Sequence, residues 1–443
     1  TMGTLGDRIG RRKVLLIGAF FFGVASVFAA FATTADMLIL ARALLGIAGA
    51  TIAPSTLSLV VNLFRDESER NRAISIWGTA FALGGLIGPL IGGLLLQYFH
   101  WGSVFLINVP IMAALLAAAP FLLPEYKDEN AGRLDLASVA LSLLTVLPIV
   151  YGFKKMAADG FVAEQLLPIA LGIVVGWIFI RRQKTLAHPM IDLALFRIPA
   201  FTASLMVNLA GVFFIFGIFL FQNLFFQLVI GLTPLEAALW SIPSSAVFTV
   251  MSFQAWRVTN RLGPVRTVLA GLVVNALGTG LMAIAAYHSS LIGVLASSMI
   301  MGIGFVPVIL TTTGLIVGTA PPERAGSASA ISETSAEFGG ALGVAILGSL
   351  VTVFYRTGMA KADLSGLAPP DADAVTATLG SAIDIAQRTG NEAAPWLITA
   401  RDSYAGGFAL CCLLATITLL LLAMIAARVY ARTDLDESRI GQH

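Results

Sequence analysis

The sequence predicts an all-α integral membrane protein, and three observations support this. Of its 443 residues, 57% are hydrophobic and only 12% are charged, whereas soluble domains carry about 25% charged residues. The apolar residues gather in long blocks, and no period-2 alternation suggests a membrane β-barrel. The formal net charge of +2 excludes a strongly basic nucleic-acid-binding protein. Its two cysteines, the adjacent Cys411 and Cys412, cannot form a disulfide framework or a zinc site.

A helix needs about 20 mostly apolar residues to cross the bilayer core. Twelve blocks meet this requirement, and the fifth and sixth are the shortest. They cover residues 14–31, 37–63, 73–97, 103–123, 134–151, 166–181, 201–228, 235–256, 265–287, 291–318, 326–355 and 404–428.

Positive charge predicts the orientation of these spans, because cytoplasmic loops are enriched in Lys and Arg. If the basic segment 8–13 is cytoplasmic, 20 of the 27 Lys and Arg residues fall on the cytoplasmic side and six on the outer side. Arg42 is the only one within a span. Both visible termini are therefore predicted to be cytoplasmic, in the cell membrane.

The sequence repeats itself after about 254 residues. Arg8-Ile9-Gly10 returns as Arg261-Leu262-Gly263, and the glycine run at 84–89 returns at 339–344. Spans 1–3 thus match spans 9–11, which predicts two six-span halves separated by two inserted spans. The first half then lacks two spans, so that the twelve visible spans are spans 3–14 of 14. The predicted parts are 1–123, the inserted spans and linker 124–199, the second half 200–428 with an outer loop 356–400, and a cytoplasmic tail 429–443.

Several motifs resemble those of the major facilitator superfamily. The loop motif comprises Gly3, Asp7, Arg8, Gly10, Arg11 and Arg12, and the antiporter motif comprises Gly84, Gly85, Gly88, Pro89, Gly92 and Gly93. Arg42 with Gly46 and Gly49 resembles the fourth-span motif, although Leu45 replaces a common Gln. The stretch Trp101 to Pro110 resembles the 14-span drug:proton antiporters of the EmrB/QacA type, and the acidic run after Ala325 resembles the QacA-like multidrug pumps. This resemblance implies the major facilitator fold and alternating access.

Two acidic residues are the sharpest candidates for coupling or cation binding. Glu333 and Glu337 lie one turn apart in the eleventh block, and at ~1.5 Å per residue Glu337 lies about 17 Å deep. A charge at that depth is expected to face a cavity. Ala82 occupies the repeat position of Glu337, so the fold itself does not require an acid there. The alternative is a protonated Glu337 that bonds another helix, with Glu333 in cytoplasmic water.

The other candidates each have a structural and a functional interpretation. Arg42 either extends to the outer interface or pairs with an acid that senses protonation. Asp7 is either a balanced loop charge or, as the resemblance implies, a brace between the halves. The glycines allow close helix packing, and Pro89 bends its helix so that it could rock. Span 7 is rich in phenylalanine, and these side chains could face either the lipid or a central cavity. The possible cavity-lining residues are Phe213, Gln222 and Asn223.

No nucleotide loop, catalytic triad, metal cluster or cofactor motif occurs in the sequence, so the prediction is a non-enzymatic transporter driven by an ion gradient. We expect a monomer that exports lipophilic, cationic drugs or antiseptics against proton entry. Two alternatives stay open: an exporter or importer of a specific metabolite, antibiotic or amino acid, and a truncated, non-transporting remnant. The outer loop is expected to be a solvated cap with one short helix over 374–388.

Overall fold

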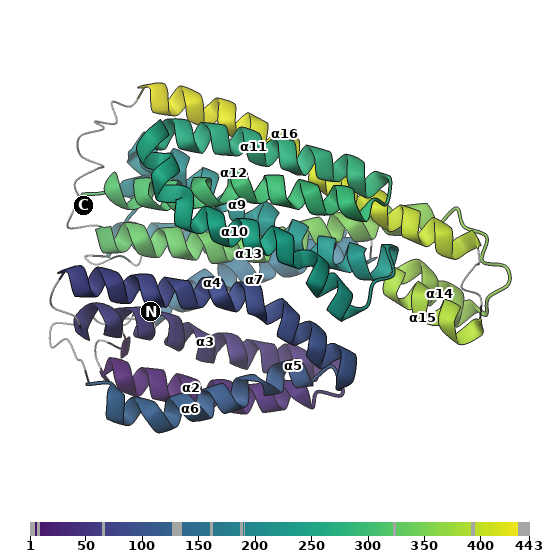
Figure 1. The fold of residues 1–443 in the computed structure, drawn as a ribbon, viewed down its shortest axis with the longest axis horizontal. Coiled ribbons are helices and arrows are strands. Elements are labelled where there is room, and N and C mark those ends of the chain that lie inside the picture. The colour runs from purple at the N-terminus through teal and green to yellow at the C-terminus, as the bar shows by residue number, and fades with distance from the viewer. Residues whose placement is uncertain are drawn as a thin grey trace. The chain divides into compact units, whose positions relative to one another are not determined.

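The protein is helical throughout the part that its computed structural model describes, and no strand occurs there (Figure 1). The described residues are 5–6, 9–63, 67–125, 135–159, 163–186, 189, 191–321, 325–390 and 395–432. Each of the twelve predicted blocks falls on a helix. These helices are α2 (Arg11–Ala30), α3 (Ala35–Leu63), α4 (Glu67–Tyr98), α5 (Ser103–Leu106) with α6 (Asn108–Leu122), α7 (Leu136–Asp159), α8 (Leu166–Thr185), α9 (Pro199–Leu224), α10 (Pro234–Leu262), α11 (Pro264–Tyr287), α12 (Leu291–Gly318), α13 (Ala325–Met359) and α16 (Pro395–Arg432).

Membrane spanning is supported by length and composition. In the described part of the chain, ten helices are long and apolar enough to cross a bilayer. The two predicted spans outside these ten are α4, of which Leu83–Tyr98 is apolar, and α10. The prediction of an all-α, multi-pass membrane protein is confirmed.

The chain divides into two compact units. The first comprises Thr1–Val139 with Thr233–Leu239, and the second comprises Ala140–Leu232 with Trp240–His443. Helix α8 and most of α7 therefore belong to the second unit. A hydrogen bond links α7 to α13, because Ser349 Oγ donates to the Phe153 carbonyl at 3.4 Å.

The first unit is built around α2, which packs against α3, α5 and α6. Its buried contact with α3 is small and apolar and consists of Ala25 and Ala29 of α2 with Ala41 and Leu45 of α3.

In the second unit, α11 packs between α12 and α16, and α9 packs on α13 (Figure 1). Close approach there requires glycine: a Cβ at Gly278 of α11 would lie 2.6 Å from the Met301 nitrogen of α12.

The structure reproduces the sequence repeat in detail. Gly10 and Gly263 precede α2 and α11 with φ of 116° and 80°, a backbone region that favours glycine. Further along, Asn108 Nδ2 of α6 donates to Ser26 Oγ of α2 at 3.3 Å, and the hydroxyls of Thr279 in α11 and Thr416 in α16 lie 2.9 Å apart. Ser26 and Thr279 follow their respective glycines by the same number of residues. Matching positions of α2 and α11 therefore each make one polar contact to a later helix of the same unit.

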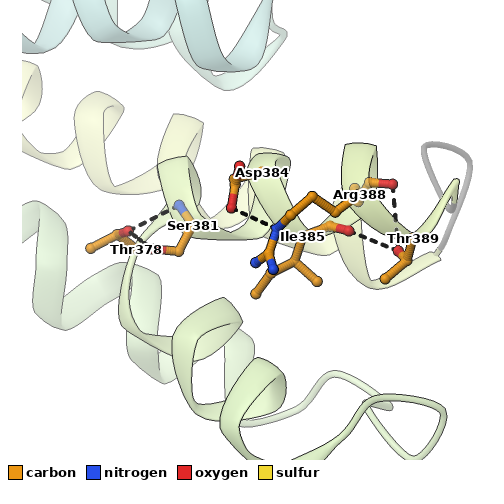
Figure 2. Close-up of polar contacts among 7 residues, drawn as sticks. Thr378, Ser381, Asp384, Ile385, Arg388 and Thr389 are labelled. Carbon is orange, nitrogen blue, oxygen red and sulfur yellow. Dashed lines mark hydrogen bonds and ion pairs between the residues drawn. The ribbon is translucent and has the colours of Figure 1, made fainter.

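The outer segment differs from its prediction, because it holds two helices instead of one over 374–388. Helix α14 spans Pro369–Ala377 and α15 spans Leu379–Thr389. Thr378 separates them in an extended conformation and its hydroxyl caps α15 by accepting from Ser381 N–H at 3.2 Å (Figure 2). The segment is also packed. Tyr355 of α13 donates to the Val375 carbonyl at 2.8 Å, and Val375 is fully buried.

Candidate functional site

The two acidic candidates share one exposed face of α13. Glu333 and Glu337 are both exposed and stand one helical turn apart. The neighbouring face of the helix is packed against α9, since a Cβ at Gly339 would lie 2.8 Å from the Leu209 carbonyl oxygen. Glu337 follows the start of α13 by twelve residues, about 18 Å along the axis. The apolar, membrane-length part of α13 is Ile331–Met359, so Glu333 lies near its start and Glu337 one turn further in, and both are exposed.

Arg42 lies on α3 in the first unit and is exposed. Its guanidinium carbon is 6.0 Å from the ring centroid of Phe105, at the limit of a cation–π contact. No ion pair of Arg42 occurs among the described residues. The ring holds the cation beside α5 and gives it a local anchor within the first unit.

The loop motif is partly visible, because Gly3, Asp7 and Arg8 lie outside the described residues. Gly10 has no room for a side chain: a Cβ there would lie 2.6 Å from the carboxyl carbon of Glu125. That carboxylate caps α2. Glu125 Oε1 accepts from the Arg12 backbone N–H at 3.0 Å, and Oε2 lies 3.8 Å from Arg12 Nε.

Arg12 completes this connection in the opposite direction. Its guanidinium donates to the carbonyls of Leu123 at 2.9 Å and Pro120 at 3.2 Å, at the end of α6. These carbonyls are left without partners by the helix end and gain a charged donor. Sequence reasoning missed Glu125, which is 113 residues away from Arg12. The only available signal was an acid directly after the fourth apolar block, at Pro124-Glu125.

The two glycine runs have different surroundings. In α13, a Cβ at Gly343 would clash with the Phe213 carbonyl oxygen of α9. In α4, a Cβ at Gly84, Gly85, Gly88 or Gly92 would meet no atom of the described residues within 4 Å. Gly93 is the exception and approaches Leu235 Cα at 3.0 Å. Pro89 lies inside the continuous helix α4, and the side chain of Ala82 lies outside the described residues.

The cavity candidates of α9 separate into two groups. Phe213 and Asn223 are half-buried, whereas Gln222 is only 1% exposed and belongs to the packed interior. The outer end of α9 continues as a π-helical turn, Phe225–Val229, and the Tyr404 hydroxyl donates to the nearby Phe221 carbonyl at 3.3 Å. Three half-buried rings that the sequence did not single out as a group connect neighbouring helices. Phe248 of α10 lies 5.7 Å from Phe219 of α9 and 6.0 Å from Phe305 of α12.

Comparison with known proteins decides the family. The Major Facilitator Superfamily model matches residues 1–344. The chain belongs to this superfamily. It is 38% identical to the multidrug efflux pump LfrA of Mycolicibacterium smegmatis, over 97% of this chain and 85% of that protein. It is 31% identical to the methyl viologen resistance protein SmvA of Salmonella typhimurium, over 87% of this chain and 78% of that protein.

Solved structures agree on the fold. A bacterial homologue of the human lysosomal transporter Spinster, in an inward-facing and unoccupied conformation, aligns with a TM-score of 0.65 at 18% identity, over 97% of this chain and 85% of that one. An auto-inhibited peptide transporter of the POT family aligns with a TM-score of 0.61 at 15% identity, over 98% and 85%. The predicted transporter family and fold are confirmed. Among the described residues, no group of His, Cys, Asp and Glu could hold a metal ion.

Proposed function

We propose that this protein is a proton-coupled multidrug efflux antiporter that exports lipophilic, cationic compounds from the cytoplasm by alternating access. It acts as a monomer in the cell membrane, with both visible termini in the cytoplasm. Relatives named for multidrug efflux and for methyl viologen resistance support drugs, and cationic ones, as substrates. A third relative, the tetracenomycin C resistance and export protein of Streptomyces glaucescens, is 29% identical over 96% of this chain and 80% of that protein, and supports export.

The observation that carries the proposal is the pair of exposed carboxylates on α13. An ionisable group far inside a membrane helix is expensive unless it serves a pathway or a binding site. Two such groups one turn apart repel each other when both are charged. The pair therefore favours binding one positive charge, either a proton or a cationic substrate. Competition between these two occupants is the simplest form of antiport.

The 14-span architecture forms part of the proposal, and its support is the internal repeat. In the second unit, α13 places Gly339 and Gly343 against α9. The equivalent glycines of α4 face open space among the described residues, although the other equivalent pairs, α2 with α3 and α11 with α12, both form. We infer that the glycine face of α4 receives a helix equivalent to α9 in a longer polypeptide, independently of where this sequence begins.

Transport by energised membranes tests the proposed function. Inverted vesicles that contain the protein should accumulate a fluorescent monovalent cation such as ethidium when respiration acidifies their interior. A protonophore should abolish the accumulation, and vesicles without the protein set the background. Accumulation that persists with the protonophore would contradict proton coupling. Accumulation of neutral amino acids but no dye would favour a metabolite exporter instead.

A further inference from the structure

A hollow on α10 is left unused by the proposed function. Its volume is about 480 Å³, and it is lined by Met251, Gln254, Arg257, Val258 and Arg261. These residues recur every three or four positions, so they share one face of the helix. All five belong to the second unit. The face runs from Met251, in the second half of α10, to the last turn of the helix, at Arg261.

The part of this hollow nearest the C-terminal end of α10 is cationic. Arg257 and Arg261 are exposed and one turn apart, and neither forms an ion pair with another residue that the structure describes. The stretch from 251 to 266 contains a third arginine, Arg266, and no acidic residue. Arg257 is oriented by a hydrogen bond of 2.9 Å from its guanidinium to Gln254 Oε1. Two uncompensated guanidinium groups, one of them oriented, suit a phosphate, which they can bind with several hydrogen bonds.

The deeper part of the hollow is apolar, and its mouth has features of a membrane interface. Met251 provides uncharged surface about one and a half turns before Arg257, and Val258 provides more between the two arginines. Trp256, next to Arg257, is exposed, and the Arg257 guanidinium carbon lies 5.5 Å from its ring centroid. Tryptophan is enriched where membrane spans meet the headgroup layer. The hollow therefore joins an anion site at headgroup level to an apolar surface at acyl-chain level.

We propose that this face of α10 binds an anionic phospholipid, with its phosphate between Arg257 and Arg261 and an acyl chain along Met251 and Val258. A free phosphate would leave the apolar part unused. A lipophilic cation would be repelled by both arginines. Lipid binding here requires only that the end of α10 reaches the membrane surface. It therefore does not depend on proton-coupled efflux.

Fluorescence quenching in lipid nanodiscs tests the proposal on the full chain. Trp256 is kept as the only tryptophan, with the other five replaced by Phe, and brominated phosphatidylglycerol or brominated phosphatidylcholine is titrated into phosphatidylcholine. Each basic residue near a membrane surface attracts anionic lipid by about fivefold in affinity. We expect phosphatidylglycerol to quench at a far lower mole fraction than phosphatidylcholine, and Arg257→Gln/Arg261→Gln to remove the difference. Both side chains are exposed, so the packing of α10 is preserved.

Two further measurements separate a specific lipid site from weaker alternatives. Arg181 lies 3.8 Å over the ring of Trp177 on α8, which provides a matched tryptophan–arginine pair. A chain with Trp177 as its only tryptophan should show a smaller preference for phosphatidylglycerol. Inorganic phosphate should not reverse the quenching of Trp256. Equal quenching by both lipids, an unchanged preference in the double variant, or full reversal by inorganic phosphate would overturn the proposal.

Discussion

Glu125 and Arg12 contact each other through both backbone and side chain: one carboxylate oxygen of Glu125 accepts the Arg12 N–H at 3.0 Å, and the other lies 3.8 Å from Arg12 Nε. The Arg12 guanidinium also donates to the Leu123 carbonyl at 2.9 Å. The start of α2 and the end of α6 are thus joined at one edge of the first unit. A carboxylate at a helix N-terminus is favoured by the unpaired N–H groups and by the helix dipole. Gly10 lies directly beside this carboxylate, and its φ of 116° is a backbone conformation that favours glycine.

Loss of this cap should destabilise the first unit. We expect Glu125→Ala to lower the free energy of unfolding by roughly 0.5–2 kcal/mol, the usual range for a helix cap. Thermal unfolding in detergent measures the effect. The control is Asp384→Asn, which removes an exposed pair with Arg388 on α15 (Figure 2) and should change stability by only about 0.3–0.5 kcal/mol. Equal shifts for both variants would show that Glu125 is an ordinary surface charge.

The polar contacts that Ser26 of α2 and Thr279 of α11 make should have similar strength. Asn108→Leu removes the bond to Ser26, and Thr416→Val removes the bond to Thr279. Each should cost about 0.6 kcal/mol, the average for hydrogen bonds between membrane helices. Equilibrium unfolding in mixed micelles measures both. A large loss for one variant and none for the other would argue against the structural repeat.

The glycine runs of α4 and α13 should respond differently to the same substitution. Gly343→Ala places a methyl group against the Phe213 carbonyl, so we expect a loss of about 1–3 kcal/mol from overpacking. Gly88→Ala has open space in front of it and improves helix propensity, so stability should stay equal or rise by up to about 1 kcal/mol. Thermal unfolding of the two variants distinguishes them. A comparable loss at Gly88 in this chain would contradict the open face of α4.

A longer polypeptide reverses that expectation. If the longer polypeptide supplies the helix that we propose to pack on α4, Gly88→Leu should be destabilising in that polypeptide. Gly343→Leu should be destabilising in both the longer polypeptide and the 443-residue chain. Thermal unfolding of both versions tests this. An unchanged stability of Gly88→Leu in the longer polypeptide would contradict a helix on the glycine face of α4.

The sequence was sufficient to predict the helices and their repeat, because both depend on local patterns. Apolar blocks of span length can only be helices in lipid, and Gly10 and Gly263 have the same backbone role in both copies. Contacts between segments that are far apart in the sequence could not be predicted in the same way. Glu125 caps a helix 113 residues earlier, and no local pattern specifies such a partner.

The outer segment shows a different limit. An amphipathic pattern over 374–388 predicted one helix, but Thr378 ends α14 and caps α15, since its side chain competes with the helical backbone for hydrogen bonds. The burial of Val375 could not be predicted either, because it depends on packing against another helix, where the Tyr355 hydroxyl donates to the Val375 carbonyl. Similarly, Gln222 and Asn223 are adjacent in the sequence, and only the packing of α9 shows that Gln222 is buried.

Substrate charge should distinguish the two acids. If Glu333 attracts cations, Glu333→Gln should weaken transport of a divalent cation such as methyl viologen more than that of monovalent ethidium. The attraction removed by one neutralised charge is proportional to the substrate's charge. Competition between the two compounds in inverted vesicles provides the ratio. Equal losses would assign Glu333 to structure or coupling.

The central claim is that the α13 carboxylates exchange a proton for substrate, and one measurement on Glu337→Gln tests it most directly. Ethidium is added outside inverted vesicles that contain the wild-type protein and have an acidic interior. A pH-sensitive probe then follows the release of internal protons that accompanies ethidium uptake. Ala82 at the repeat position indicates that the helix tolerates a neutral side chain, so the variant should insert and fold. We predict substrate-dependent proton release by the wild type and none by Glu337→Gln at equal protein levels. Undiminished proton release by the variant would contradict the account.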